Sequence, residues 1–150
     1  MLFDTDVLIW VLRGSAKAAR LVDETGNRQI SVVTLMELLQ GARDKHETRL
    51  IKKFVVELGF RTLPLTENTG HRAVVYMEEY GLSSGLRVAD ALIAATAAEN
   101  NLTLCSGDRS HYRAIAEIVL LPFRLNVRIP RSGKTIFPRM IPKLPYKWRY

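Results

Sequence analysis

The sequence has 150 residues, of which 47% are hydrophobic, with 22 Lys and Arg against 15 Asp and Glu. This length and apolar content predict a compact domain with its own core and leave no room for two full domains. Its single cysteine, Cys105, excludes an internal disulfide and a Cys-rich zinc site, which favours a cytoplasmic location. An acidic start argues against a signal peptide, and no run approaches the roughly 20 apolar residues of a membrane span.

The charge divides the chain into two unlike parts. Residues 1–121 hold 14 basic and all 15 acidic residues, so their net charge is −1. Residues 122–150 hold eight basic residues, no acidic residue and five of the six prolines. We predict a folded domain over residues 1–125 and a basic, Pro- and aromatic-rich extension over 126–150. The extension either neutralises phosphates and stacks on unpaired bases or lies outside the functional domain.

Strands and helices are predicted to alternate along residues 1–121. An apolar strand ends at Phe3, a helix follows until Gly14, and a second helix begins at Ser15 and ends before Gly26. The other predicted elements are a strand over 29–33, a helix opening at Thr34, a helix with its apolar face over 50–58, a strand over 60–65, a helix over 66–80, a loop over 81–85, a helix over 86–99, a strand over 102–105, a short helix over 109–117 and a strand over 118–121. This alternation predicts an α/β fold with a parallel sheet covered on both faces.

Carboxylates follow the predicted strand ends, where ligands gather in such sheets. Asp4 and Asp6 follow the first strand, Glu37 lies one helical turn beyond the second, and Asp108 follows the fourth. Asp90 comes from inside the helix over 86–99 and shares its face with apolar residues. Burial of a lone carboxylate there would cost several kcal/mol, so Asp90 needs a compensating partner. Arg87, three residues earlier, is one candidate.

Converging carboxylates without His or Cys form an all-oxygen set, which Mg²⁺ or Mn²⁺ prefers over zinc. The three histidines, His46, His71 and His111, show no metal-ligand spacing. One or two such ions bind a phosphodiester oxygen, lower the pKa of a bound water and stabilise the leaving oxygen. The pattern therefore indicates nuclease chemistry.

Each acid also has a purely structural interpretation. Glu37 could close a capping box that Thr34 begins. Asp4 and Asp6 could cap the first helix, and Asp108 could be a turn or cap residue. The residues alone leave these alternatives open.

Four segments together resemble the PIN-domain ribonucleases, and in particular the VapC-type toxins of prokaryotic toxin–antitoxin pairs. They are LFDTDVLIW from residue 2, SVVTLMELLQG from residue 31, RVADALIAATA from residue 87 and LTLCSGDRSHY from residue 102. Their order and spacing match the family over about residues 1–125. The resemblance implies a three-layer α/β/α sandwich around a short parallel sheet, Mg²⁺- or Mn²⁺-dependent endoribonuclease activity, a homodimer and a VapB-like antitoxin as partner.

The resemblance also assigns residues to the site. Three acids of the family's metal site match Asp4, Glu37 and Asp90, and the fourth, Asp or Asn in relatives, matches Asp108. The family's polar supporting positions match Thr5, Thr34 and Ser106. We further expect Arg109 and Arg113 to contact the RNA backbone. A helix face with Lys45, Arg49, Lys52 and Lys53 is another candidate for RNA docking, although such a face is typical of solvated helices.

Two positions depart from the family's pattern. Position 6 is usually Asn or Ser and is Asp here, so Asp6 either strengthens metal binding or caps the helix. An extra acid often follows the fourth, and here Arg109, Ser110 and His111 occupy that stretch. Occupancy of a second metal position is therefore left open.

Two other functions compete with this interpretation. A haloacid-dehalogenase-like phosphotransferase would use Asp4 as nucleophile and Asp6 as acid/base. However, no lysine lies between residues 54 and 133 to hold its phosphate. A non-catalytic PIN-like module would bind RNA without holding metal. RNA cleavage, phosphate-ester hydrolysis and sensitivity to EDTA separate the three.

Overall fold

The computed structural model describes residues 1–124. Its centre is a five-stranded parallel sheet in the order β3-β2-β1-β4-β5. The strands are β1 (Leu2–Phe3), β2 (Gln29–Ser31), β3 (Arg61–Leu63), β4 (Leu104–Ser106) and β5 (Leu120–Pro122). After β3 the chain crosses to the far side of β1 and forms β4. The strand order therefore reverses between β1 and β4, which is where ligands bind in open α/β sheets.

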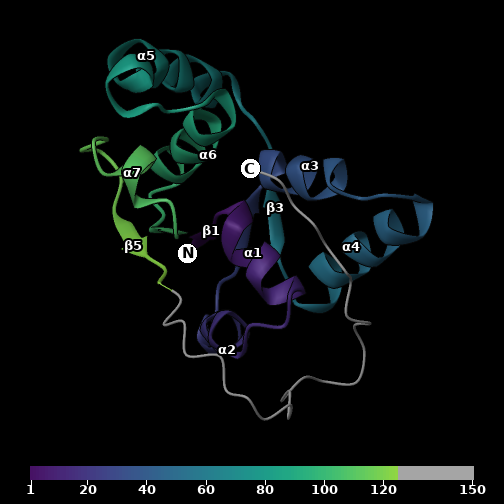
Figure 1. Cartoon of the computed structure of the whole chain (residues 1–150). Helices are drawn as coiled ribbons and strands as arrows, with labels where there is room; N and C mark the ends of the chain where they lie inside the picture. Colours follow the sequence, from purple (N-terminus) through teal and green to yellow (C-terminus); the bar gives the residue numbers. More distant parts are fainter. Residues whose placement is uncertain (125–150) are drawn as a thin grey trace.

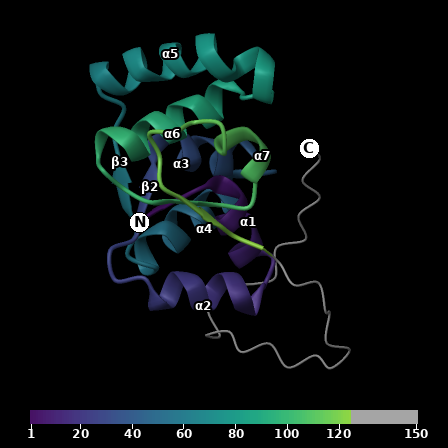
Figure 2. The same cartoon turned by 90° about the vertical axis from the view of Figure 1, so that its left-hand side faces the viewer.

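Helices cover both faces of this sheet (Figures 1 and 2). They are α1 (Thr5–Leu12), α2 (Ala16–Glu24), α3 (Val32–Gln40), α4 (Lys45–Glu57), α5 (Glu67–Ser84), α6 (Val88–Glu99) and α7 (Arg109–Tyr112). The two figures place α5 and α6 on one side of the sheet and α2 on the other. The predicted three-layer α/β/α sandwich is confirmed.

Alternation along the strands divides the core in two. Phe3 and Cys105 point to one face and pack with α1, α2 and α4, whereas Leu2 and Leu104 point to the other and pack with α5 and α6. All four side chains have no exposed surface. Because both neighbours at the reversal of strand order are buried on both faces, β1 and β4 form a rigid base for the residues that follow them.

Several predicted boundaries are wrong for local reasons. The strand over 29–33 ends at Ser31, because the Ser31 hydroxyl accepts the amide N–H of Val33 at 3.2 Å and begins α3 before Thr34. The helix predicted over 66–80 continues to Ser84, so residues 81–84 of the predicted loop are helical. Gly85 ends it with a left-handed φ of 70°.

Two later boundaries also differ. The helix over 86–99 starts at Val88, so Asp90 lies in its first turn and not in its interior. The helix predicted over 109–117 ends at Tyr112, and the last strand is Leu120–Pro122. The predicted extension over 126–150 lies outside the described residues. Within residues 1–124, no helix has the length and apolar character needed to cross a membrane.

Candidate functional site

Asp4 stands at the carboxyl end of β1, beside β4. Its amide donates to the Cys105 carbonyl at 2.9 Å, which ties it to the neighbouring strand. Its Oδ1 accepts the Thr5 N–H and its Oδ2 accepts the Ser106 hydroxyl, both at 2.7 Å. Asp4 therefore caps α1, as the structural interpretation held, while its carboxylate is fixed at the point where the strand order reverses. The side chain is buried, with 6% of the residue exposed.

Ser106 connects this carboxylate to the loop after β4. Its hydroxyl donates to Asp4 and accepts the N–H of Asp108 at 2.9 Å. The residue is fully buried. A single hydroxyl thus sets the position of Asp4 relative to Asp108, because it contacts the side chain of one and the backbone of the other.

Asp6 approaches the same loop from the first turn of α1. Its Oδ2 accepts the N–H of Gly107 at 2.7 Å. A Cβ atom at position 107 would lie 2.4 Å from Asp6 Oδ2 and 3.3 Å from the Phe123 carbonyl oxygen. Position 107 must therefore be glycine for the Asp6 carboxylate to reach the loop.

Glu37 comes from α3 and meets α1. It accepts the hydroxyl of Thr5, whose side chain is almost entirely buried. The proposed capping box with Thr34 is wrong, because Ser31 caps the helix and Glu37 lies in its second turn. This shift of register leaves the Glu37 carboxylate available to the cluster.

Asp90 enters from the first turn of α6. Its Oδ2 accepts the main-chain N–H of Arg87 at 3.2 Å, so Arg87 is a partner through its backbone and not through its guanidinium. Its Oδ1 accepts the hydroxyl of Tyr112 at 3.4 Å. Tyr112 is fully buried, and this burial raises the pKa of its phenol well above 10. Tyr112 has no predicted role, since an aromatic residue on a short helix indicates only a core position.

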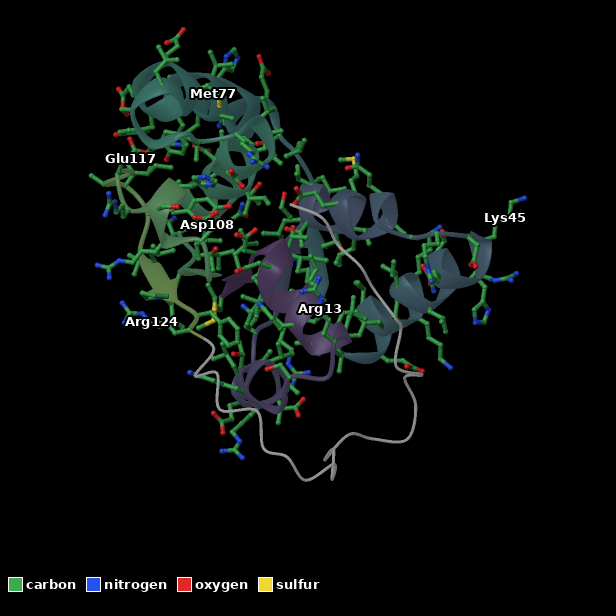
Figure 3. The ribbon with its side chains drawn as sticks, viewed as in Figure 1. Arg13, Lys45, Met77, Asp108, Glu117 and Arg124 are labelled. Carbon is green, nitrogen blue, oxygen red and sulfur yellow. The ribbon has the colours of Figure 1, made fainter. Side chains whose placement is uncertain are left out.

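Asp108 caps α7 and faces inward (Figure 3). Its Oδ1 accepts the Ser110 hydroxyl at 2.6 Å and the His111 N–H at 3.3 Å. The His111 ring lies between two acids, with Nδ1 at 3.0 Å from both Asp90 Oδ2 and Asp108 Oδ2. Sequence spacing missed His111 as a site residue, because its two neighbours come from different elements.

The acids perturb one another. Burial, followed by the charge of Asp6, raises the pKa of Asp4 from 3.8 to about 8. Burial also raises the pKa of Asp6 to about 6, with charges from Asp108 and Asp90 contributing. The pKa of Glu37 is raised by burial and again by Asp90. The residues predicted from four separate segments therefore lie within electrostatic range of one another.

The protein supplies little positive charge to this cluster. Within residues 1–124, no Lys or Arg side chain forms an ion pair with Asp4, Asp6, Glu37, Asp90 or Asp108, and His111 is the sole basic partner. Arg109 and Arg113 are exposed on and beside α7. Lys45 lies at the outer end of α4, away from Asp108 (Figure 3), which places the candidate basic face of α4 apart from the acids.

The donor chemistry fits a divalent cation. Three buried polar atoms have no hydrogen-bond partner among residues 1–124, and all three belong to predicted or neighbouring site residues: Asp6 Oδ1, Thr34 Oγ1 and His111 Nδ1. Buried polar atoms normally have partners, so these mark an unmet demand for an ion or its water shell. Over the same residues, no group of three or more His, Cys, Asp or Glu side chains is arranged so that it could hold a metal ion.

These features define a class: an α/β/α protein with an acidic, oxygen-rich site at the reversal point of its parallel sheet. The PIN domain family matches residues 1–117. The chain belongs to the PIN domain family, so the resemblance seen in the sequence is confirmed. No curated protein sequence matches the chain significantly.

Solved structures share the fold. A toxin–antitoxin complex from Klebsiella pneumoniae is 26% identical with a TM-score of 0.68, over 83% of this chain and 98% of that chain. FitAcB from Neisseria gonorrhoeae is 24% identical with a TM-score of 0.64, over 80% and 95%. VapBC2 from Rickettsia felis, bound to a promoter DNA fragment, is 17% identical with a TM-score of 0.68, over 82% and 98%.

Proposed function

We propose that this protein is a Mg²⁺- or Mn²⁺-dependent endoribonuclease and the toxin of a toxin–antitoxin pair. The observation that carries the proposal is the gathering of five carboxylates without Lys or Arg partners among residues 1–124. Such mutual repulsion is tolerable when a divalent cation joins the cluster. Membership in the PIN family supports nuclease chemistry over a phosphotransferase.

The residues would hold the cation as follows. Asp4, Glu37, Asp90 and Asp108 are the proposed ligands. When bound, Mg²⁺ or Mn²⁺ supplies an acidified water and neutralises charge on the phosphodiester. Three side chains support the ligands through hydrogen bonds: Thr5 orients Glu37, Ser106 orients Asp4, and Asp6 fixes the loop after β4. Thr34 in α3 carries a buried hydroxyl without a partner among residues 1–124 and is the fourth proposed supporting residue.

RNA would approach across α7. Arg109 and Arg113 are exposed next to Asp108, so their guanidinium groups are free to neutralise backbone phosphates near the acids. The candidate basic face of α4 lies apart from the acids (Figure 3). We therefore propose these two residues, in preference to the α4 face, as RNA contacts.

The proposed protein partner is a VapB-like antitoxin. The Klebsiella pneumoniae and Rickettsia felis structures are both toxin–antitoxin complexes, and this chain covers nearly all of the matched chain in each. A homodimer is proposed on the same family likeness. A small reading frame beside the gene, whose product co-purifies with this chain and suppresses its activity, would support the assignment.

The decisive experiment is metal-dependent cleavage by the purified full chain. We expect RNA to be cut with Mg²⁺ or Mn²⁺, cutting to stop with EDTA and return with Mn²⁺, and single-stranded DNA of equal length to persist. Asp90→Asn should reduce cleavage by about 100-fold or more while the fold persists, because the amide still accepts the Arg87 N–H but carries no charge. Asp23→Asn, an exposed position on α2, is the matched control.

The other outcomes name the competing functions. RNA binding that is unaffected by EDTA, without cleavage under any metal, indicates a non-catalytic module. Hydrolysis of a small phosphate ester without RNA cleavage indicates a phosphotransferase. Mapping cleavage ends across total cellular RNA would then name the substrate.

The domain boundary is part of the proposal. Residues 1–125 form the nuclease domain and 126–150 the extension. A truncation ending at Asn126 should keep its cleavage rate, RNA affinity and salt dependence. A weaker affinity with a shallower salt dependence would instead assign phosphate contacts to the extension.

A further inference from the structure

An apolar groove lies open at the surface between α5 and α6. The two helices run side by side at one edge of the molecule, with α5 outermost (Figures 1 and 2). The groove has a volume of about 430 Å³, and Val74 and Met77 of α5 line it together with Val88 and Leu92 of α6. Val74 is 57% exposed and Val88 is 63% exposed. Exposed apolar side chains that gather around a groove in this way mark a contact surface.

The α5 edge of this groove is acidic. Glu78 is one of the lining residues, and Glu67 lies on the same helix face, because both are spaced from Val74 by whole turns. The arginine of α5, Arg72, already pairs with two other acids, and exposed Arg87 lies at the α6 side. In all, α5 and α6 contain five acidic residues and one arginine: Glu67, Glu78, Glu79, Asp90 and Glu99 against Arg72. The groove therefore favours an occupant with both apolar and positively charged side chains.

The extension over 126–150 has the complementary composition. From Ile136 to Tyr150, apolar and aromatic side chains alternate with basic ones. Pro138, Pro142 and Pro145 restrict the backbone of this stretch, which lowers the entropy that it loses on binding. The extension contains no acidic residue and seven basic ones: Arg128, Arg131, Lys134, Arg139, Lys143, Lys147 and Arg149.

The extension is long enough to reach the groove from its own chain. The described residues end at Arg124, two residues after β5. At about 3.3 Å per residue, residues 125–136 span up to about 40 Å, whereas a domain of this size is about 35 Å across. The apolar stretch that begins at Ile136 can therefore reach α5. The acids of the candidate site would attract the same cations, so a test must separate the two destinations.

We propose that the groove between α5 and α6 is a docking surface for the extension of the same chain. Apolar side chains between Ile136 and Tyr150 fill the groove, and neighbouring Lys and Arg side chains lie against Glu67 and Glu78. Burial of the apolar side chains supplies the affinity, while the charges select this occupant over an acidic one. The lining residues include none of the proposed metal ligands, so the inference goes beyond the proposed function and does not depend on it.

Limited proteolysis of the full chain in EDTA tests the docking. A docked extension should resist trypsin after Lys143 and Lys147, because cleavage requires the released segment. Val74→Lys should raise the cleavage rate at these sites by about 10-fold or more, because it places a positive charge in the groove. Glu78→Lys should have the same effect, since it reverses the charge of the edge. Val56→Lys is the matched control, because Val56 is 76% exposed on α4, and it should leave the rate unchanged.

Cross-linking of the wild-type chain identifies the destination directly. A zero-length carbodiimide reagent should join Lys143 or Lys147 to Glu67 or Glu78, as read by mass spectrometry. Cross-links to the acids of the candidate site, or to exposed Asp23 on α2, in place of these would overturn the proposal. Cross-links between isotopically labelled and unlabelled copies would assign the groove to a second copy and overturn it as well.

Equal cleavage rates in wild type and in both groove variants would also contradict the docking. The cross-links are read on the wild-type chain, so they decide the question even if a variant fails to fold. Both measurements are made without metal or RNA. Their failure would therefore leave the proposed nuclease untouched, and the absence of RNA cleavage would leave the docking surface untouched.

Discussion

The buried acids make the metal-free fold sensitive to pH, and Asp4→Asn is the sharpest test of that sensitivity. The folded-state pKa of Asp4 lies above its ordinary value of 3.8, at about 8. A group of this kind contributes stability that is present at low pH and is lost as pH rises through the folded pKa. Asp6 and Glu37 act in the same direction. In EDTA, the free energy of unfolding should therefore fall between pH 5 and pH 8.

The magnitude follows from the shift. A rise from 3.8 to about 8 is about four pKa units, and at roughly 1.4 kcal/mol per unit it corresponds to about 6 kcal/mol as an upper bound for ionised Asp4. Asn at position 4 keeps an oxygen that accepts the Thr5 N–H, and its amide N–H can donate to the Ser106 oxygen in place of accepting from it. After relaxation of the site, we expect Asp4→Asn to stabilise the metal-free protein by about 2–4 kcal/mol at pH 8, or about 10 °C in Tm.

The assay is thermal or urea unfolding in EDTA at pH 5 and pH 8, with Asp23→Asn as the exposed control. At pH 5 the gain from Asp4→Asn should be about a third of the gain at pH 8, because wild-type stability falls only once the pH exceeds 3.8, where Asp4 ionises in the unfolded chain. The pKa values of Asp44 and Glu47 are lowered, so their contributions to stability change below pH 5 and do not affect the comparison between pH 5 and pH 8. Equal stability of wild type at both pH values, or a loss of stability in Asp4→Asn at pH 8, would refute the reasoning.

Two further predictions concern the base of the site. Gly107→Ala should lower the free energy of unfolding by about 1–3 kcal/mol and weaken Mn²⁺ binding, because the new Cβ would lie 2.4 Å from Asp6 Oδ2. Thermal unfolding and calorimetry measure the two effects. Gly26→Ala is the control, because the space around its Cβ is open. Cys105 is fully buried and its pKa is raised to about 12 by burial, so a disulfide reagent should modify it only after unfolding. Rapid modification of the native thiol would show that β1 and β4 are not the rigid base described.

The sequence predicts the parts of this site that depend on strand ends. Asp4 and Asp108 follow buried strands, and parallel pairing of β1 with β4 brings those ends together. The alternation of strands and helices was sufficient for this, because a parallel sheet needs a helix in each crossover. Glu37 is predicted by its place one helical turn beyond the second strand, and Asp90 by its place among apolar residues on one helix face. Family likeness then matches all four acids to one site.

What the sequence could not predict depends on where helices begin. A shift of α3 to a start at Val32 changes Glu37 from a capping residue into a side chain that faces Thr5. Ser31 and Thr34 are both suitable N-cap residues for α3. Which of them caps the helix depends on the packing that ends β2 at Ser31. His111 and Tyr112 were missed for a related reason. Their partner Asp90 lies on another helix, and only tertiary packing joins them.

The two departures from the family's pattern also balance each other. Asp6 adds a negative charge where relatives usually carry a neutral Asn or Ser, and an Asp6 oxygen lacks a partner. The stretch after Asp108 lacks the extra acid, and there His111 contacts the carboxylates of Asp90 and Asp108. The first departure adds one acidic residue to the family's pattern and the second removes one, so the number of acidic residues near the end of β4 stays the same.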